Sequence, residues 1–94
     1  MTKTSIKQKA KNRKVAFSIE APEAKTVFLA GDFNNWGPDP MKKDDDGVWK
    51  RTLKLAPNIY EYKFIIDGEW KMDLQNSKTC SNCFGTKNNI LAVS

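Results

Sequence analysis

Short stretches in which apolar and polar residues alternate recur along this chain. The clearest runs from residue 59 to 67 (IYEYKFIID), where aromatic and aliphatic side chains alternate with Glu and Lys. A period of two is typical of a β-strand with one buried face. Similar patterns occur at residues 13–20, 26–30, 48–55, 69–72 and 89–93, with a shorter one near Met41. No segment has the period of an amphipathic helix. The pattern therefore predicts an all-β sandwich of about six to eight short antiparallel strands.

Turn-forming residues separate these segments. Pro22 and Pro57 interrupt the pattern, since proline has no amide hydrogen to donate to a sheet. The sequences Asp44–Gly47 (DDDG) and Asp67–Gly68 predict tight turns, because glycine tolerates a positive φ. DDDG lacks the alternating ligands and the distant glutamate of a calcium loop, which favours the turn. Residues 32–40 are expected to form a loop and residues 73–87 a polar connection.

Length and composition restrict the class of protein. A chain of 94 residues with 39% apolar and 29% charged residues is typical of one soluble globular domain. No apolar run approaches the roughly 20 residues of a transmembrane helix. The basic N-terminal segment has no apolar stretch behind it and does not resemble a secretory signal. The cytoplasm is the expected location.

The positive charge lies at one end of the chain. Six of the 16 Lys and Arg residues are within residues 1–14, which contain no acid, so ten basic and 11 acidic residues remain. The remainder of the chain is therefore close to neutral, with a net charge of −1. We expect residues 1–12 to be a disordered basic tail and residues 13–94 to be the folded module. A tail of this kind contacts phosphates only non-specifically, so neither a specific nucleic-acid partner nor a membrane is expected.

The chain has no histidine and two cysteines. Without histidine, the commonest general base and metal ligand is missing, which disfavours an enzyme or a metal site. Cys80 and Cys83 form a single CxxC, too few ligands for a structural zinc unless two chains share the metal. Two free thiols are expected in a reducing compartment. A disulfide flanking Phe84 under oxidising conditions is an alternative hypothesis.

Three tryptophans carry the main functional signal. Trp49 shares a strand face with leucines and is expected in the core. Trp36 follows two asparagines in a loop and Trp70 follows a hairpin turn, so each is either a binding platform or a core residue. An exposed indole stacks on the apolar face of a glucose ring, whose hydroxyls require hydrogen bonds at the edge. Lys63 and the amides Asn88 and Asn89 are candidates for a polar rim that supplies those bonds.

Three motifs resemble a known family. The sequences FLAGDFNNW, YEYKFIIDGEW and GTKNNI, in this order, are similar to those of family 48 carbohydrate-binding modules. Such modules occur as the glycogen-binding domain of the AMP-activated kinase β subunit and as the N-terminal domain of isoamylases and branching enzymes. The resemblance extends over residues 13–94. It implies an immunoglobulin-like β-sandwich that binds α-1,4-linked glucan, such as glycogen, maltooligosaccharide or cyclodextrin, without catalysis, cofactor or metal.

The resemblance also implies a set of carbohydrate-binding residues. It assigns sugar stacking to two tryptophans, hydrogen bonds to Lys63 and Asn88, and a further polar contact to Thr86. The kinase-type domain has a leucine where Phe84 stands here, which leaves the preference for cyclic or helical glucan open. The expected site is therefore Trp36, Lys63, Trp70, Phe84, Thr86 and Asn88. The alternative function is a β-sandwich that docks a glucan-active enzyme or kinase partner without binding sugar.

Overall fold

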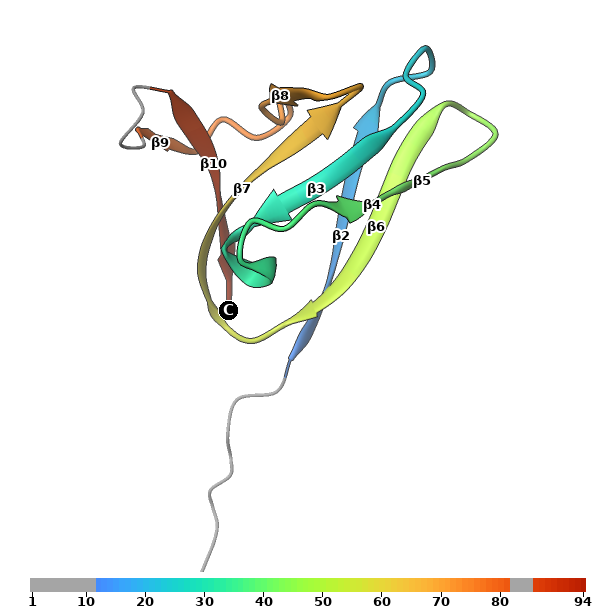
Figure 1. Cartoon of the computed structure of the whole chain (residues 1–94). Coiled ribbons are helices and arrows are strands. Elements are labelled where there is room, and N and C mark those ends of the chain that lie inside the picture. The colour runs from blue at the N-terminus through green and yellow to red at the C-terminus, as the bar shows by residue number, and fades with distance from the viewer. Residues whose placement is uncertain (1–11, 82–85) are drawn as a thin grey trace, which may run out of the picture.

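The computed structural model describes residues 12–81 and 86–94, which form nine strands and one short 3₁₀ helix (Figure 1). The elements are β2 (Arg13–Glu20), β3 (Val27–Gly31), η1 (Asp32–Asn34), β4 (Asp39–Pro40), β5 (Lys42–Lys43), β6 (Val48–Leu55), β7 (Asn58–Ile66), β8 (Glu69–Lys71), β9 (Thr79–Ser81) and β10 (Lys87–Val93). Within the described part of the chain, no helix is long and apolar enough to cross a membrane.

The strands form two antiparallel sheets that pack face to face. The larger sheet has the order β4-β3-β7-β10-β9, and β8 also pairs with β7. The smaller sheet has the order β2-β6-β5. The chain crosses between the sheets from β2 to β3, from β4 to β5 and from β6 to β7 (Figure 1). The predicted all-β sandwich is confirmed.

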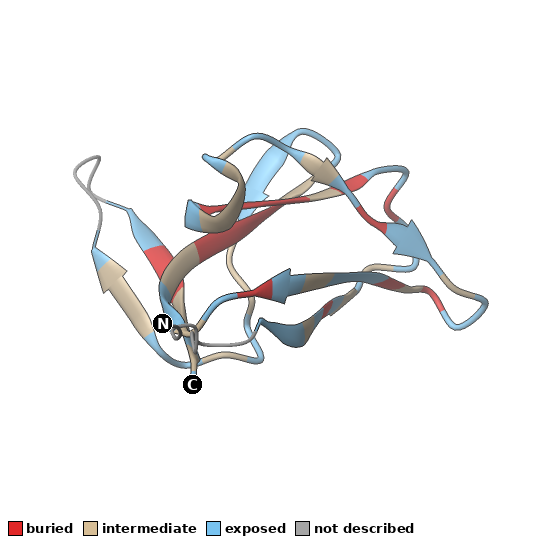
Figure 2. Ribbon diagram, turned by 90° about the horizontal axis from the view of Figure 1, so that it is seen from below, coloured by how far each residue is buried: buried red, intermediate tan, exposed pale blue. Residues whose placement is uncertain are grey.

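The core lies between the two sheets, where the inward residues of each strand meet. Phe64 and Leu29 of the larger sheet are completely buried, and Phe17 and Trp49 of the smaller sheet are 5% and 8% exposed. Figure 2 shows buried segments on the strands of both layers where they face each other. Phe17 contacts Tyr62 edge to face, with 5.3 Å between ring centroids. The core placement predicted for Trp49 is confirmed, and its indole Nε1 donates to the Ala21 carbonyl at 2.9 Å.

Two predicted tight turns are present. Asp67 and Gly68 have φ angles of 49° and 85° and connect β7 to β8. Gly47 has φ 81° at the end of the DDDG turn, where the Asp44 carboxylate accepts hydrogen bonds from the Asp46 and Val48 amides. The neighbouring Lys50 ammonium has the largest effect in lowering the pKa of Asp44, and the two amide bonds lower it further. The carboxylate therefore closes a turn, as the sequence predicted.

The loop and connection predicted from polar composition contain short elements. Residues 32–40 include η1 and the two-residue strand β4, which pairs with β3 through Phe28 and Pro40. Strand β9 lies within the polar stretch 73–87 and pairs with β10. It was missed because it is only three residues long and its burial comes from contact with β10 rather than from a local apolar pattern. The tail predicted for residues 1–12 lies outside the described residues except for Asn12 and stays a prediction.

A buried polar network holds the connection between β8 and β9 against the larger sheet. The Asn89 side chain is completely buried and accepts a hydrogen bond from the Asp73 amide at 2.7 Å. It also donates to the carbonyls of Asp73 and Asn76, both at 3.0 Å. The Tyr62 hydroxyl donates to Asp73 Oδ2 and accepts from Asn76 Nδ2. Burial raises the pKa of Tyr62, so its hydroxyl remains protonated in this network.

Candidate functional site

A hollow of about 540 Å³ lies on the outer side of the larger sheet, away from the core. Its volume falls within the usual range for small-molecule sites. The lining comes from the segment after β3, from β7, from β8 and from the start of β10, which lie side by side because β8 and β10 both pair with β7. The residues that line it are Asp32, Trp36, Glu61, Lys63, Trp70, Thr86 and Asn88.

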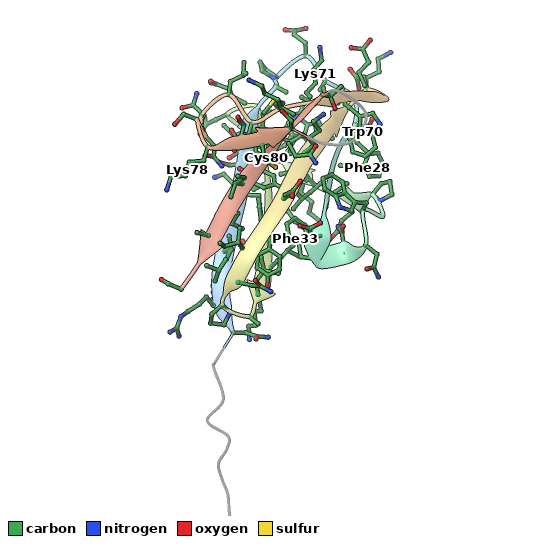
Figure 3. All side chains as sticks on the ribbon, turned by 90° about the vertical axis from the view of Figure 1, so that its left-hand side faces the viewer. Phe28, Phe33, Trp70, Lys71, Lys78 and Cys80 are labelled. Atoms are coloured by element: carbon green, nitrogen blue, oxygen red, sulfur yellow. The ribbon has the colours of Figure 1, made fainter. Side chains whose placement is uncertain are left out.

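The apolar part of the hollow consists of two indoles. The ring centroids of Trp36 and Trp70 are 6.2 Å apart, and the ring planes are inclined by 51°. Trp70 is 53% exposed on the outer face, whereas Trp36 is half-buried. Figure 3 shows Trp70 and Cys80 at the same end of the sheet, on either side of β7. The structure thus brings together the two tryptophans that the sequence singled out, although 33 intervening residues separate them.

Trp36 is held in an unusual backbone conformation. Asn35 and Trp36 have φ angles of 55° and 61°, a region that non-glycine residues rarely adopt and that costs about 1–3 kcal/mol each. The preceding Asn34 stabilises the turn, because its side chain accepts from the Gly31 amide and donates to the Leu29 carbonyl. The Trp36 amide donates to the Gly31 carbonyl at 2.9 Å. The asparagines of the FNNW motif therefore form the turn that presents the indole.

Lys63 lies deeper than a solvated strand lysine. It faces the outer side of β7, opposite the inward Tyr62 and Phe64, yet is only 9% exposed. Its ammonium donates to the Thr86 hydroxyl at 3.2 Å, which brings together two of the residues predicted to contact sugar. The structure therefore places Lys63 in the lining of the hollow rather than at an open polar rim.

The consecutive residues Asn88 and Asn89 face opposite sides of β10. Asn88 is 6% exposed, lines the hollow and donates from Nδ2 to Glu61 Oε1 at 3.0 Å. Asn89 pairs with the inward-facing Tyr62 and is completely buried in the polar network. The suggestion that Asn89 supplies a bond to sugar is therefore wrong, because strand alternation points it into the sandwich.

Two carboxylates in the lining were missed by the sequence analysis. Asp32 starts the loop that carries Trp36, and Glu61 lies two residues before Lys63 on the same face of β7. Asp32 Oδ1 accepts from the Trp36 indole Nε1 at 2.9 Å, and Oδ2 accepts from the Glu61 amide at 2.8 Å. Strand alternation around Lys63 was the available signal for Glu61. The contact of Asp32 with Glu61 has no local signal, because Glu61 lies on another strand.

Cys80 lies on β9 opposite Asn88, at the edge of this region. A hydrogen bond to the Glu61 carboxylate, followed by burial, raises the pKa of its thiol above the ordinary value. Cys83 and Phe84 lie outside the described residues, so the role expected for Phe84 and the disulfide hypothesis stay predictions. Among residues 12–81 and 86–94, no three His, Cys, Asp or Glu side chains lie close enough together to hold a metal ion.

The geometry defines a class of protein: a small β-sandwich with an open aromatic and polar binding hollow on one sheet. A family described as the glycogen recognition site of AMP-activated protein kinase matches residues 14–94. The chain belongs to this family, and the predicted resemblance to a glycogen-binding module is confirmed. Such a module is a carbohydrate-binding domain.

Several proteins are similar to this chain in sequence. Protein PTST homolog 2, chloroplastic, from Arabidopsis thaliana is 43% identical over 72 residues, which are 76% of this chain and 13% of that protein. The 5'-AMP-activated protein kinase subunit beta-1 of Sus scrofa is 36% identical over 69 residues, 73% of this chain and 55% of the relative. Phosphoglucan phosphatase DSP4, amyloplastic, from Castanea sativa is 33% identical over 81 residues, 84% of this chain and 22% of the phosphatase.

A solved structure has the same fold. The crystal structure of maltogenic amylase from S. marinus superimposes with a TM-score of 0.74 and 25% sequence identity, and the match covers 90% of this chain and 14% of the amylase chain. The match supports the predicted immunoglobulin-like form of the sandwich. The chain spans between 13% and 55% of the three relatives described above.

Proposed function

We propose that this chain binds α-1,4-linked glucan in the hollow between Trp36 and Trp70 and catalyses no reaction itself. The two indoles stack on the apolar faces of glucose units. Lys63, Asn88 and Thr86 exchange hydrogen bonds with sugar hydroxyls at the base of the hollow. The observation that carries the proposal is the convergence of these five residues, from four separate segments, on one concave surface.

The inclination of the indoles supports a curved ligand. Two coplanar rings would form the flat platform that suits a straight, ribbon-like chain. Here the planes are inclined by 51° at a centroid separation of 6.2 Å, so glucose units stacked on both rings must turn relative to each other. An α-1,4-linked chain has this curvature, in maltooligosaccharide, in cyclodextrin and at the ends of glycogen. A straight β-1,4-linked chain does not.

The buried positions of Lys63 and Asn88 support hydrogen bonding rather than general surface polarity. Both side chains are more than nine-tenths covered, and both are already oriented by partners in the free protein, Thr86 and Glu61. Oriented donors lose less conformational freedom on binding. The surface is nevertheless shallow and open, and hydroxyls must be stripped of water, so we expect a dissociation constant in the micromolar to millimolar range.

The test is a titration with maltoheptaose, followed by calorimetry and tryptophan fluorescence, with cellohexaose as the straight-chain control. The wild type is expected to bind maltoheptaose and not cellohexaose. No heat and no fluorescence change at millimolar maltoheptaose would refute the proposal. Equal binding of both sugars would refute the role of the ring inclination.

The contribution of Trp70 follows from its exposure. A tryptophan presents about 250 Å² when fully exposed, so the 53% that remains open here is roughly 130 Å². If a glucose ring covers about half of this area, roughly 65 Å² leaves water, worth about 1.6 kcal/mol. Trp70→Ala should therefore weaken maltoheptaose binding about tenfold or more. Trp70→Phe retains part of the stacking surface and should bind with intermediate affinity; unchanged binding in both variants would misplace the site.

We also propose that the module holds a larger assembly against glucan polymer. The kinase subunit and the phosphoglucan phosphatase that it resembles are longer than this chain, and so is the amylase. A glucan-active enzyme or a kinase, in the same chain or bound to it, is the proposed partner. Co-sedimentation of the full-length protein with glycogen, followed by identification of proteins released with maltoheptaose, tests this role. Recovery of the protein without an enzyme or kinase would contradict it.

The cytoplasm remains the proposed location. The proposal rests on the expectation that Cys80 and Cys83 are both free thiols, which persist in a reducing compartment. The plant relatives named above carry chloroplastic and amyloplastic designations, so a plastid is the competing location. A fluorescent fusion of the full-length protein distinguishes the two, and a plastid signal would overturn the proposal.

A further inference from the structure

The hollow contains more negative charge than a neutral sugar requires. Asp32 and Glu61 are both in its lining, and Lys63 is the cation among the seven lining residues. Neither carboxylate was among the residues predicted to contact sugar. Each carboxylate is hydrogen-bonded to a residue that was predicted to contact sugar: Asp32 to Trp36, and Glu61 to Asn88. Their position therefore requires a separate explanation.

Asp32 connects the tryptophan loop to the central strand. Its two oxygens accept from different segments, Oδ1 from the Trp36 indole at 2.9 Å and Oδ2 from the Glu61 amide at 2.8 Å. Asp32 and Glu61 are 29 residues apart in sequence, so this contact is purely tertiary. A carboxylate accepts both bonds at once, whereas an amide or hydroxyl side chain cannot accept through two oxygens.

Glu61 continues the connection to the last strand. Its backbone amide is held by Asp32, and its Oε1 accepts from Asn88 Nδ2 at 3.0 Å. Hydrogen bonds thus connect Trp36 to Asp32, Asp32 to the backbone amide of Glu61, and the Glu61 carboxylate to the Asn88 side chain. It joins the loop after β3, strand β7 and strand β10 across the site.

We propose that Asp32 is a positioning residue for the glucan site, which fixes the indole of Trp36 at the inclination needed for stacking. The proposal rests on the proposed function. Trp36 needs such a constraint because its backbone has an unfavourable positive φ and its ring is only half-buried, so core packing alone does not set the ring orientation. With the ring oriented beforehand, binding loses less side-chain freedom.

The expected effect on affinity is modest and measurable. Ordering a flexible side chain at an interface costs about 0.5–1.5 kcal/mol, which corresponds to roughly a 2- to 12-fold change in the dissociation constant. We expect Asp32→Ala to weaken maltoheptaose binding within this range. Asp32→Asn retains one acceptor oxygen and should have intermediate affinity. Asp45→Ala removes the same charge from the exposed DDDG turn and should bind like the wild type.

The orientation itself is read from the indole N–H signals in a ¹H–¹⁵N NMR spectrum, assigned with Trp36→Phe. Asp32→Ala should shift the Trp36 signal and speed its exchange with solvent, while the Trp49 signal, which reports the bond to Ala21, should not move. A change in both signals would indicate a general loss of structure and would overturn the positioning role.

The outcomes separate the two proposals. A wild type that fails to bind maltoheptaose refutes the proposed function and, with it, the positioning role. A wild type that binds, with Asp32→Ala equal to it in affinity, refutes the positioning role alone. An unmoved Trp36 indole signal in Asp32→Ala also refutes it, whatever the affinity. Weaker binding together with a selective Trp36 shift and an intermediate Asp32→Asn supports it.

Discussion

The two asparagines of the GTKNNI motif should have separable roles, and their alanine variants test this. Asn89 is completely buried and makes three hydrogen bonds, to the Asp73 amide and to the carbonyls of Asp73 and Asn76. Asn88, its neighbour, has its side chain on the opposite face, in the lining of the hollow. We expect Asn89→Ala to reduce stability and Asn88→Ala to reduce binding.

The magnitudes follow from the contacts. A hydrogen bond contributes about 1 kcal/mol net, so Asn89→Ala should lower the free energy of unfolding by about 3 kcal/mol. In a domain of this size the loss corresponds to a fall in Tm of roughly 12–24 °C, a large part of a total stability of about 5–15 kcal/mol. Asn88→Ala breaks the bond to Glu61 beside an open hollow and should lower the free energy of unfolding by about 1 kcal/mol.

The assay combines urea unfolding, followed by circular dichroism, with maltoheptaose titration at a temperature at which both variants are folded. Asn89→Ala should shift the midpoint by about 1–3 M urea and retain binding within a factor of about three. Asn88→Ala should bind about fivefold more weakly, equivalent to one lost hydrogen bond. Equal stability losses in the two variants would refute the assignment of faces. Loss of binding in folded Asn89→Ala would refute the separation of roles.

Three further predictions concern charge and packing. The Thr26 and Lys25 amides lower the pKa of Asp67 below 3.8. The stability that its ionised form contributes is therefore present above pH 3.8 and is lost as pH falls through the lowered folded-state pKa. Asp67→Asn should flatten the decline of Tm below about pH 4, and parallel curves of Tm against pH for the variant and the wild type would contradict this. Glu61→Gln should lower the raised pKa of Cys80 towards 9.0 and speed the alkylation of its thiol by iodoacetamide at pH 8, measured by peptide mass spectrometry. An unchanged alkylation rate would show that the Glu61 carboxylate does not raise this pKa. A Cβ at Gly31 would lie 2.6 Å from the Glu61 carbonyl oxygen, so Gly31→Ala should lower the free energy of unfolding, measured with urea, by about 1–3 kcal/mol. The control Gly37→Ala, whose nearest contact would be at 3.3 Å, should lower it less. A larger loss in Gly37→Ala than in Gly31→Ala would disprove the close approach.

Sequence alone determined the local features of this protein. Alternation identified the longer strands and placed Trp49 in the core and Lys63 on the face opposite Tyr62, since side-chain direction in a strand is set by a period of two. Asp-Gly pairs marked the tight turns, because glycine supplies the positive φ that these turns require. Three short motifs were sufficient to indicate the family, which the match over residues 14–94 confirmed.

The tertiary structure decided how these parts form a site. Alternation places Asn88 and Asn89 on opposite faces, but only the pairing of β10 with β7 shows which one faces the hollow. The contacts of Asp32 and Asn88 with Glu61 span 29 and 27 residues. No local pattern encodes such contacts, because they depend on which strands the sheet makes neighbours. The sequence context of Trp36 and Trp70 likewise marked both as candidates. Only the packing of the loop against the hairpin brought their rings together at an angle.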